Sequence, residues 1–317
     1  MLFRAFVHYH IIKTSLIDEY QAVSKITIIG AGEIGKALGF VLQVTPNDIN
    51  FWDRDLGKVP DQDPLKEIIP QADYILLCVP SWELRGALES ISRLVSPQSV
   101  IMTPSKGIEE QSLKNVGVIM EELLPNNPMA LISGPMLAEE LMLGKNGFAV
   151  VASKSEIAIQ KILLLFKDTG LHLQPSDDLI GVALCGVLKN IYSVSLGIAD
   201  GLELGNNVKG GLALQAIWEM SLIVEILGGQ RETVLGLAGI ADFIATGFSD
   251  FSRNRKSGFE MGKRGTCELK SEGVASVRSI VTMLGPINDF PLLSALDRAC
   301  VQSQDTKAEF EKLLVSI

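Results

Sequence analysis

Histidine and cysteine are scarce in this sequence, and their positions argue against several kinds of site. The 317 residues include three histidines: His8 and His10 precede the first expected strand, and His172 falls within a later one. The four cysteines, at 78, 185, 267 and 300, show neither CxxC spacing nor histidine partners, so no metal site is expected. A histidine–aspartate proton carrier is not indicated either. Unpaired cysteines are typical of a reducing compartment, which predicts a cytoplasmic protein.

The sequence also lacks an excess of basic residues and long apolar runs. Its formal net charge of −9 argues against nucleic acid as a partner, although one local basic pocket for a small anion remains compatible. No apolar run approaching 18 residues is evident, so membrane insertion is not expected. Residues 1–24 are interrupted by Arg4 and two histidines, which is unlike a signal peptide and predicts a disordered or docked extension.

Alternating strand and helix patterns fill the first half of the chain. With 47% hydrophobic and 21% charged residues, the chain is typical of globular proteins and long enough for two domains. Expected strands are 25–29, 48–52, 73–79, 98–102, 129–133, 147–151 and 169–174, and expected helices include 81–93, 112–123, 135–143 and 155–166. This alternation predicts an α/β, doubly wound, mostly parallel sheet of the Rossmann type over residues 25–175.

A glycine-rich motif follows the first expected strand. Gly30, Gly32 and Gly35 form G-x-G-x-x-G between a strand and an apolar helix, a pattern that lets backbone amides approach a pyrophosphate. Asp53 ends the second strand near the offset expected for a ribose-binding carboxylate, which favours NAD. The adjacent Arg54 is suited to a 2′-phosphate, so NADP remains open.

A P-loop is the alternative interpretation of the same glycines, because Gly30 to Lys36 nearly matches its spacing. Ala37 stands where a P-loop needs a hydroxyl for Mg²⁺, and the strand ending at Val79 carries no terminal acid. The dinucleotide interpretation is therefore favoured. Pro80 and Lys106 follow two other strands, where ligands of such sheets bind, so both are candidates for contact with the coenzyme.

Helical spacing dominates after Pro175, over 177–202, 207–227, 231–247 and 272–284, with terminal helices to 317. Residues 176–317 are therefore expected to form an all-helical domain. On its first helix Cys185, Lys189 and Ser193 share a face, and Gly186 and Gly197 make that side small enough for another backbone or a ligand to approach. With no suitable histidine, G-x-S-x-G motif or metal cluster, a lysine is the best available proton carrier.

A second basic element lies at Ser252-Arg253-Asn254-Arg255-Lys256. Arginine presents a planar fork of donors that suits phosphate oxygens. Taken alone, this run is more typical of a solvated basic loop.

Collinear motifs from about residue 25 to residue 285 resemble the NAD(P)-dependent glycerol-3-phosphate dehydrogenase family. They comprise G-A-G-x-x-G at 30–35, S-K-G-I-E at 105–109, S-G-P-x-x-A-E-E at 133–140, G-x-L-K-N at 186–190, G-I-A-D-G-L-x-L-G-x-N at 197–207, G-L-A-G-I-A-D at 236–242, S-R-N-R at 252–255 and E-G-V at 272–274. The resemblance implies reversible reduction of dihydroxyacetone phosphate to sn-glycerol 3-phosphate, feeding glycerophospholipid synthesis, by a homodimer joined through its helical domain.

The resemblance also implies residue roles. Lys189 corresponds to the catalytic acid/base, with Lys106 and Asp242 as its partners in the site. The implied substrate-binding residues are Lys106, Gly134, Met136, Lys189, Asn190, Asp242, Thr246, Ser252, Arg253 and Asn254. The implied contacts to NAD or NADP are Gly30, Gly32, Glu33, Ile34, Gly35, Asp53, Arg54, Pro80, Lys106, Ala138, Arg253 and Glu272.

Several positions depart from the family pattern. Glu33 stands where the family has a small polar residue, and Ile34 stands where it has an aromatic one. Met136 replaces a substrate-contacting serine, and Leu184 replaces an acid. The segment from 54 to 72 is also short. Two alternatives therefore remain: another lysine-dependent dehydrogenase of the β-hydroxyacid type, which would not need Arg253, and a catalytically silent NAD(P)-binding sensor.

Overall fold

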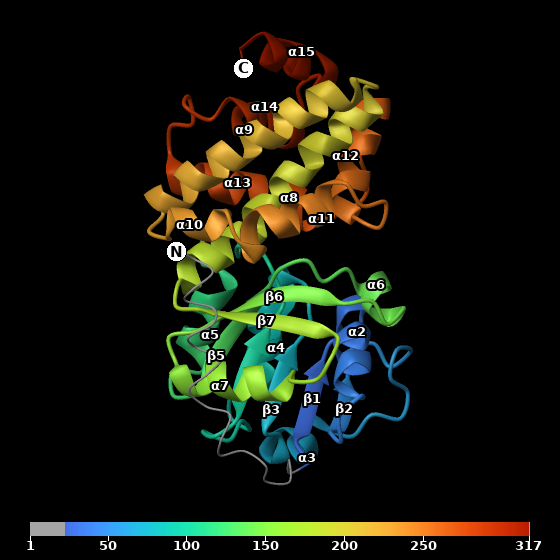
Figure 1. The fold of residues 1–317 in the computed structure, drawn as a ribbon, viewed down its shortest axis with the longest axis vertical. Helices are drawn as coiled ribbons and strands as arrows, with labels where there is room; N and C mark the ends of the chain where they lie inside the picture. Colours follow the sequence, from blue (N-terminus) through green and yellow to red (C-terminus); the bar gives the residue numbers. More distant parts are fainter. Residues whose placement is uncertain (1–22, 317) are drawn as a thin grey trace.

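A sheet region and a helical region are stacked along the long axis of the molecule (Figure 1). The computed structural model describes residues 23–316. The predictions for the terminal extension, residues 1–24, therefore lie almost entirely outside the described residues.

Seven strands form one sheet in the order β2-β1-β3-β4-β5-β6-β7. All neighbouring strands are parallel except β5 and β6. The strands are β1 (Lys25–Ile29), β2 (Asp48–Trp52), β3 (Tyr74–Leu77), β4 (Val100–Thr103), β5 (Met129–Ser133), β6 (Gly147–Ala152) and β7 (Leu171–Ser176). The predicted mostly parallel, doubly wound sheet is confirmed. The last strand ends at Ser176 rather than 174 and includes Pro175, which is tolerated because β7 is an edge strand.

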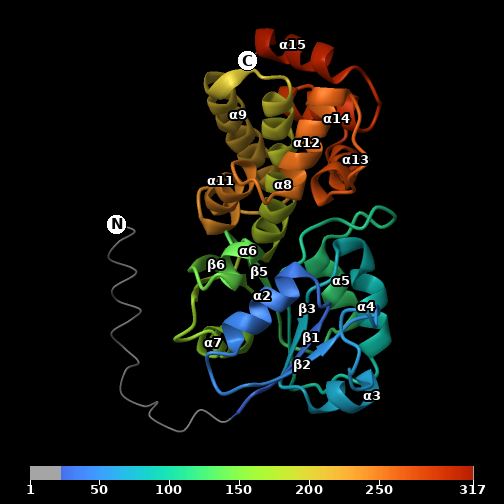
Figure 2. The same cartoon turned by 90° about the vertical axis from the view of Figure 1, so that its right-hand side faces the viewer.

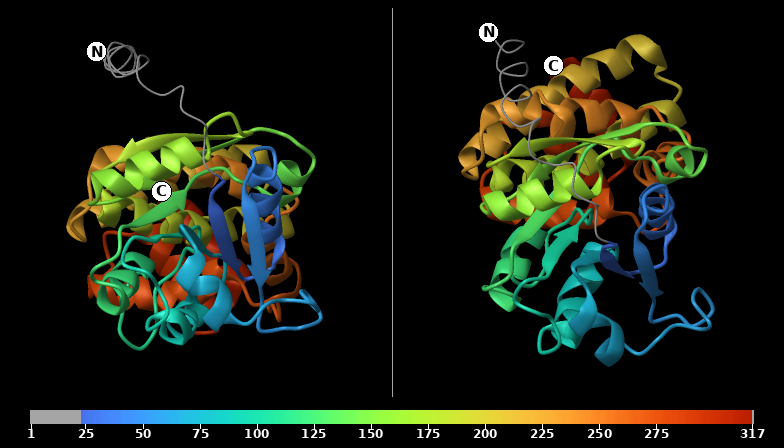
Figure 3. Two further views of the ribbon diagram at one scale, coloured as in Figure 1. Left: turned by 90° about the horizontal axis from the view of Figure 1, so that it is seen from below. Right: turned by 60° about the horizontal axis from the view of Figure 1, so that its bottom comes forward.

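Helices cover both faces of the sheet (Figure 2, Figure 3). One face carries α2 (Glu33–Leu42) and α7 (Glu156–Leu165), and the other carries α4 (Leu84–Ile91) and α5 (Val116–Leu123). Strand residues alternate between these layers: Ile28 packs with α2 and α7, whereas the next residue, Ile29, packs with α4 and α5. Shorter elements are α3 (Leu65–Ile68), η1 (Ile69–Gln71), η2 (Ser81–Glu83) and α6 (Ala138–Met142).

The strand order reverses at β1, which has β2 on one side and β3 on the other. Ligands of such sheets bind at this switch point, beyond the carboxyl ends of the strands. Gly30 follows β1 with a φ of 100°, and a Cβ on it would lie 2.5 Å from the carbonyl oxygen of Cys78. Only glycine therefore lets the turn after β1 fit against the chain leaving β3.

The helical region contains eight α-helices and one π-helical turn among the described residues. They are α8 (Leu179–Gly201), α9 (Gly205–Ile226), α10 (Arg231–Val234), η3 (Leu237–Ala241), α11 (Asp242–Gly247), α12 (Arg253–Arg264), α13 (Glu272–Leu284), α14 (Pro291–Cys300) and α15 (Thr306–Ser316). One apolar core is continuous from these helices to the face of the sheet covered by α4 and α5.

The sequence-based expectation of no membrane-length apolar run was wrong for α8. This helix of 23 residues is long and apolar enough to cross a membrane, but 89% of its most apolar window is buried inside the protein. It is the central helix of the molecule, and its apolar composition reflects contact with other helices on nearly every side.

Helix α12 was not predicted, because it packs through small residues instead of an apolar stripe. Its buried residues include Ser257 and Gly258. A Cβ on Gly258 would lie 2.0 Å from the carbonyl oxygen of Val194, and a Cβ on Gly197 would lie 2.0 Å from that of Arg255. The two backbones are therefore in contact, which confirms the prediction that the small face of α8 accepts another backbone.

The expected single helix over 231–247 was also wrong. It is divided into α10, the π-helical turn η3 and α11. A Cβ on Gly239 would lie 2.1 Å from the carbonyl oxygen of Val234, so the wide turn folds closely over the end of α10. Asp242 follows the π-helical turn directly. Such turns often occur at functional sites, where they change the direction of a side chain.

Candidate active site

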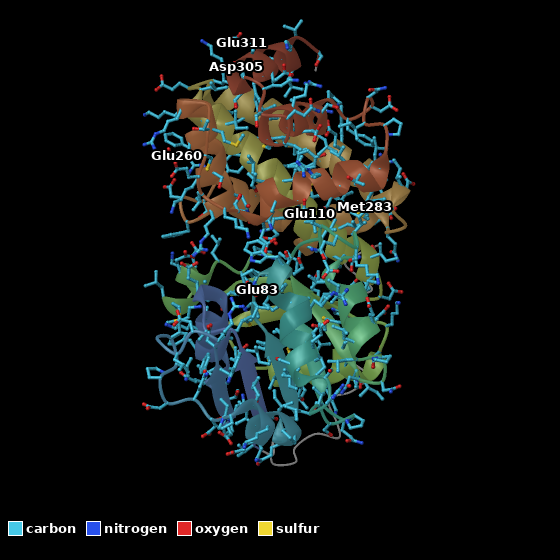
Figure 4. The ribbon with its side chains drawn as sticks, turned by 180° about the vertical axis from the view of Figure 1, so that it is seen from behind. Glu83, Glu110, Glu260, Met283, Asp305 and Glu311 are labelled. Carbon is cyan, nitrogen blue, oxygen red and sulfur yellow. The ribbon has the colours of Figure 1, made fainter. Side chains whose placement is uncertain are left out.

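A cavity of about 1200 Å³ opens between the sheet region and the helical region. Its wall combines the turn after β1, the ends of β2 and β3, and residues from α8, α11, α12 and the start of α13. Glu83, part of this wall, lies where the two regions meet (Figure 4). Nearby, Glu110 forms an ion pair with Arg278 of α13 across the same boundary, at 3.7 Å.

The glycine-rich turn forms one end of the cavity. Gly30, Gly32, Glu33 and Ile34 line it, and a Cβ on Gly32 would meet no atom within 4 Å. That face of the turn is therefore open. Gly35 is not part of the wall. A Cβ on Gly35 would lie 2.0 Å from the carbonyl oxygen of Gly30, so this glycine lets the first turn of α2 pack against the turn after β1.

Lys189 lies on the cavity wall with two partners from α11. Its Nζ donates to Thr246 Oγ1 at 2.7 Å and to Asp242 Oδ1 at 3.1 Å. Lys106, from the loop after β4, donates to the other carboxylate oxygen of Asp242 at 2.7 Å. One buried carboxylate thus holds two lysines from different regions of the protein. The stem of Lys106 passes close to Gly186, where a Cβ would lie 3.0 Å from its Cγ.

This arrangement shifts the pKa values of both Lys189 and Asp242. Burial lowers the pKa of Lys189 to about 8; the carboxylate of Asp242 opposes this shift, and the charge of Lys106 adds to it. Burial alone would raise the pKa of Asp242, but the charges and hydrogen bonds of the two lysines bring it below its ordinary value. Near neutral pH the carboxylate is ionised, and Lys189 is an ammonium that releases its proton readily.

The basic run predicted from sequence forms the N-terminus of α12. Ser252 caps the helix, its Oγ accepting from the backbone N–H of Arg255 at 3.2 Å. Arg253 lies on the cavity wall, and its Nη2 lies 3.1 Å from Glu33 Oε1, both side chains being largely exposed. The resemblance linked Arg253 to substrate and coenzyme, and its position between α12 and the glycine-rich turn is compatible with both.

Asn254 fixes this helix end beside the lysine. Its Nδ2 donates to Asn190 Oδ1 at 2.8 Å, and its Oδ1 accepts from the backbone N–H of Gly273 at 2.8 Å. Lys189 and Arg253 are thus each adjacent in sequence to one member of a buried asparagine pair. Arg255, in contrast, turns away from the cavity and pairs with Asp200 and Asp250.

Sequence reasoning did not identify the role of Ser81. Its backbone N–H donates to Glu272 Oε1 at 3.0 Å, and its hydroxyl donates to Glu272 Oε2 at 2.7 Å. A Cβ on Gly107 would lie 2.0 Å from Ser81 Oγ, so the Lys106 loop packs on this contact. Burial raises the pKa of Glu272, and the two donors of Ser81 oppose that rise. The Val-Pro-Ser sequence after β3 was the available signal, because it lies at a strand end.

Most of the residues predicted for the site line this one cavity. They are Gly30, Gly32, Glu33, Ile34, Asp53, Arg54, Pro80, Lys106, Met136, Ala138, Lys189, Asn190, Thr246, Ser252, Arg253, Asn254 and Glu272. Gly35, Gly134 and Asp242 do not contribute to the wall. A Cβ on Gly134 would lie 2.5 Å from the carbonyl oxygen of Phe148, so this glycine allows β5 and β6 to approach. Lys58 and Trp82 belong to the wall but were not predicted.

Two family models match the chain. The N-terminal model of NAD-dependent glycerol-3-phosphate dehydrogenase matches residues 57–158, and the C-terminal model matches residues 178–311. A glycerol-3-phosphate dehydrogenase [NAD(P)+] from Clostridium tetani is 33% identical over 317 residues, covering 90% of this chain and 91% of the relative.

Solved structures agree with the family models. The glycerol-3-phosphate dehydrogenase of Coxiella burnetii superposes with a TM-score of 0.85 at 26% identity, covering 92% of this chain and 99% of that one. D-mandelate dehydrogenase shares the fold alone. Its structure is 14% identical with a TM-score of 0.61, covering 91% of this chain and 99% of that one. The chain therefore belongs to the NAD-dependent glycerol-3-phosphate dehydrogenase family and is an oxidoreductase that reduces dihydroxyacetone phosphate with NAD(P)H.

Proposed function

We propose that Lys189 is the acid/base of this reduction and that Arg253 anchors the substrate phosphate. The supporting observation is that both cations line one cavity, joined by the hydrogen bond between Asn190 and Asn254. A small molecule with a ketone at one end and a phosphate at the other fits between an ammonium and a guanidinium held in this way.

The cavity also fits a dinucleotide. Gly32 presents an open face at the N-terminus of α2, where backbone amides attract a pyrophosphate. Gly30, Gly32 and Ile34 would hold the pyrophosphate, and Pro80, Ala138 and Glu272 would surround the nicotinamide. When bound, the reduced coenzyme supplies the hydride that reaches carbon C2 of the substrate.

The residues of the chain handle the proton and the charge. As negative charge develops on the C2 oxygen, the ammonium of Lys189 stabilises it and transfers a proton to it. Asp242 keeps Lys189 charged despite burial, and Lys106 contributes a second cation beside the same oxygen. Arg253 and backbone N–H groups at the start of α12 hold the phosphate, so binding energy remote from C2 orients the carbonyl.

The test follows NAD(P)H absorbance with dihydroxyacetone phosphate and the purified full-length chain. We expect turnover by the wild type. Lys189→Met should lose turnover but still bind dihydroxyacetone phosphate. Arg253→Ala should raise the KM for that substrate about tenfold or more, since arginine–phosphate hydrogen bonds are charge-assisted. An unchanged KM in Arg253→Ala would show that Arg253 does not anchor the substrate phosphate. No turnover by the wild type with either coenzyme would favour a catalytically silent sensor.

We further propose that residues 25–175 form the coenzyme domain and that residues 176–317 form the substrate and dimerisation domain. We also propose that the protein is a cytoplasmic homodimer that supplies glycerol 3-phosphate for glycerophospholipids. Leu214, Trp218 and Leu222 are exposed and one helical turn apart on α9, which supports an apolar contact between two helical domains. Light scattering of the purified chain tests the dimer; a monomer at micromolar concentration would contradict it. Fractionation of the source cells tests the location, and a membrane-bound enzyme would contradict it.

A further inference from the structure

We propose that Lys58 determines coenzyme choice by binding the 2′-phosphate of the adenosine ribose, so that the enzyme uses NADP(H) in preference to NAD(H). This inference rests on the proposed function, because it concerns the far end of the same cavity. Lys58 lies in the short segment after β2 and is part of the cavity wall with Asp53 and Arg54.

The carboxylate expected to bind the ribose of NAD is already fully engaged within the protein. Asp53 Oδ2 accepts from the backbone N–H of Ala31 at 2.8 Å and from Lys58 Nζ at 3.1 Å. Oδ1 accepts from the backbone N–H of Asp55 at 2.9 Å and from Lys58 Nζ at 3.3 Å. Since Asp53 is 8% exposed, little of its surface is left to accept two hydroxyls from a ribose.

The bonds of Asp53 give it a structural function instead. Its bond to Ala31 ties the end of β2 to the glycine-rich turn after β1. Burial would raise the pKa of Asp53, but the backbone donors of Asp55 and Ala31, followed by Lys58, bring it below its ordinary value. The carboxylate is therefore ionised at neutral pH and is committed to holding the turn and Lys58.

The segment that carries Lys58 is fastened at its other end. Gln62 Nε2 donates to the carbonyl oxygen of Asp53 at 2.9 Å, and Gln62 Oε1 accepts from the backbone N–H of Asp53 at 2.7 Å. The backbone N–H of Lys58 also donates to the carbonyl oxygen of Asp55 at 3.0 Å. These contacts keep the ammonium at the cavity wall, whereas its side chain remains 44% exposed.

An ammonium carries three donors, so Lys58 keeps a donor for a phosphate while it bonds both carboxylate oxygens of Asp53. Arg54 also lines the cavity, but its guanidinium pairs with Glu83 at 3.0 Å and is 80% exposed. Such an exposed pair is weak and can be exchanged for a phosphate dianion. Lys58 is the better-positioned cation, since both its backbone and its ammonium are held.

Two readouts test this inference, and the first does not depend on catalysis. Calorimetry with 2′,5′-ADP and with 5′-AMP measures recognition of the 2′-phosphate, and kcat/KM with NADPH and with NADH measures coenzyme choice. The variants are Lys58→Ala and Lys58→Gln, with Lys66→Ala as control, because Lys66 is an exposed lysine eight residues further along and outside the cavity wall. Thermal melting verifies that each variant folds.

We expect the wild type to favour NADPH and to bind 2′,5′-ADP more tightly than 5′-AMP. Lys58→Ala should lower kcat/KM for NADPH about ten- to a hundredfold, the range for a charge-assisted hydrogen bond. The value for NADH should stay unchanged or rise, because Asp53 loses a competing partner. Lys66→Ala should match the wild type. A wild type that favours NADH, or an equal loss for both coenzymes in a folded Lys58 variant, would overturn the inference. Without turnover, the proposed function fails, and binding of 2′,5′-ADP still decides the role of Lys58.

Discussion

Replacement of Asp242 by asparagine should shift the pH dependence of reduction strongly toward acid. In the wild type the reaction needs Lys189 as an ammonium, so kcat for reduction should be constant at neutral pH and fall as the pH rises through about 8. The carboxylate of Asp242 opposes the effect of burial on the pKa of Lys189. Asp242→Asn removes that charge and preserves the shape of the side chain.

The contact distance sets the size of the shift. Two unit charges 3.1 Å apart, the separation of Lys189 Nζ and Asp242 Oδ1, attract by about 5 kcal/mol at an effective dielectric constant of about 20. That energy corresponds to nearly four pKa units as an upper limit, at about 1.4 kcal/mol per unit. We expect a fall of at least about two units, since water and neighbouring dipoles replace part of the attraction.

The loss at neutral pH follows directly. With a pKa of about 8, roughly nine-tenths of Lys189 is protonated at pH 7; with a pKa of about 6, roughly one-tenth is. Protonation alone should therefore reduce kcat for reduction about tenfold at pH 7, and lowering the pH toward 5.5 should restore part of the activity.

Lys106→Met provides the matched comparison, because it removes a positive charge beside the same carboxylate. The charge of Lys106 lowers the pKa of Lys189, so this variant should move the midpoint toward alkaline pH, the opposite direction. The assay is kcat from NAD(P)H absorbance at saturating dihydroxyacetone phosphate between pH 5.5 and 9.5. Midpoints that stay together in the wild type and both variants would refute Lys189 as the titrating acid.

Three further changes test other parts of the site. Ser81→Ala removes one hydrogen-bond donor from Glu272, so the pKa of Glu272 should rise further. The KM for the coenzyme should then increase several-fold at acidic pH, with kcat little changed. An unchanged KM at every pH would show that the contact is not used. Asn254→Ala leaves Asn190 and the N–H of Gly273 without their partner, and should lower the free energy of unfolding in urea by about 2 kcal/mol. Glu33→Gln should release Arg253 from its ion pair and lower the KM for dihydroxyacetone phosphate by about twofold, because exposed pairs are weak; a higher KM would show that Glu33 positions the arginine.

Much of the sheet region could be predicted from sequence, because buried parallel strands are short apolar runs separated by clear turn residues. The run from Lys25 to Ile29 and the glycines after it defined the strand, the turn and the coenzyme end of the cavity. The helical region was harder. Helix α12 begins with Arg253 and contains two glycines, so it has no apolar period, although its glycines are what allow contact with α8.

Long-range partners were the least predictable part of the site. The motifs pointed to Lys189, Asp242 and Lys106, but the sequence does not reveal that one carboxylate bonds both lysines. Nor does the sequence show that Asp53 is engaged by Ala31 and Lys58, since that depends on how five residues after β2 fold back on the strand. Ser81 and Glu272 are 191 positions apart, and only the packing of the two regions brings them together.

The π-helical turn before Asp242 makes backbone register a requirement for activity. A π-turn accommodates one residue more than an α-helical turn. If residues 237–241 kept their number but wound as ordinary α-helix, the extra residue would rotate every downstream side chain by about 100° around the axis. The carboxylate would swing away from both ammonium groups while all three residues kept their chemical identity. A chain that keeps all the residues of this segment but loses the wide turn would therefore be inactive, although its site residues look complete in an alignment.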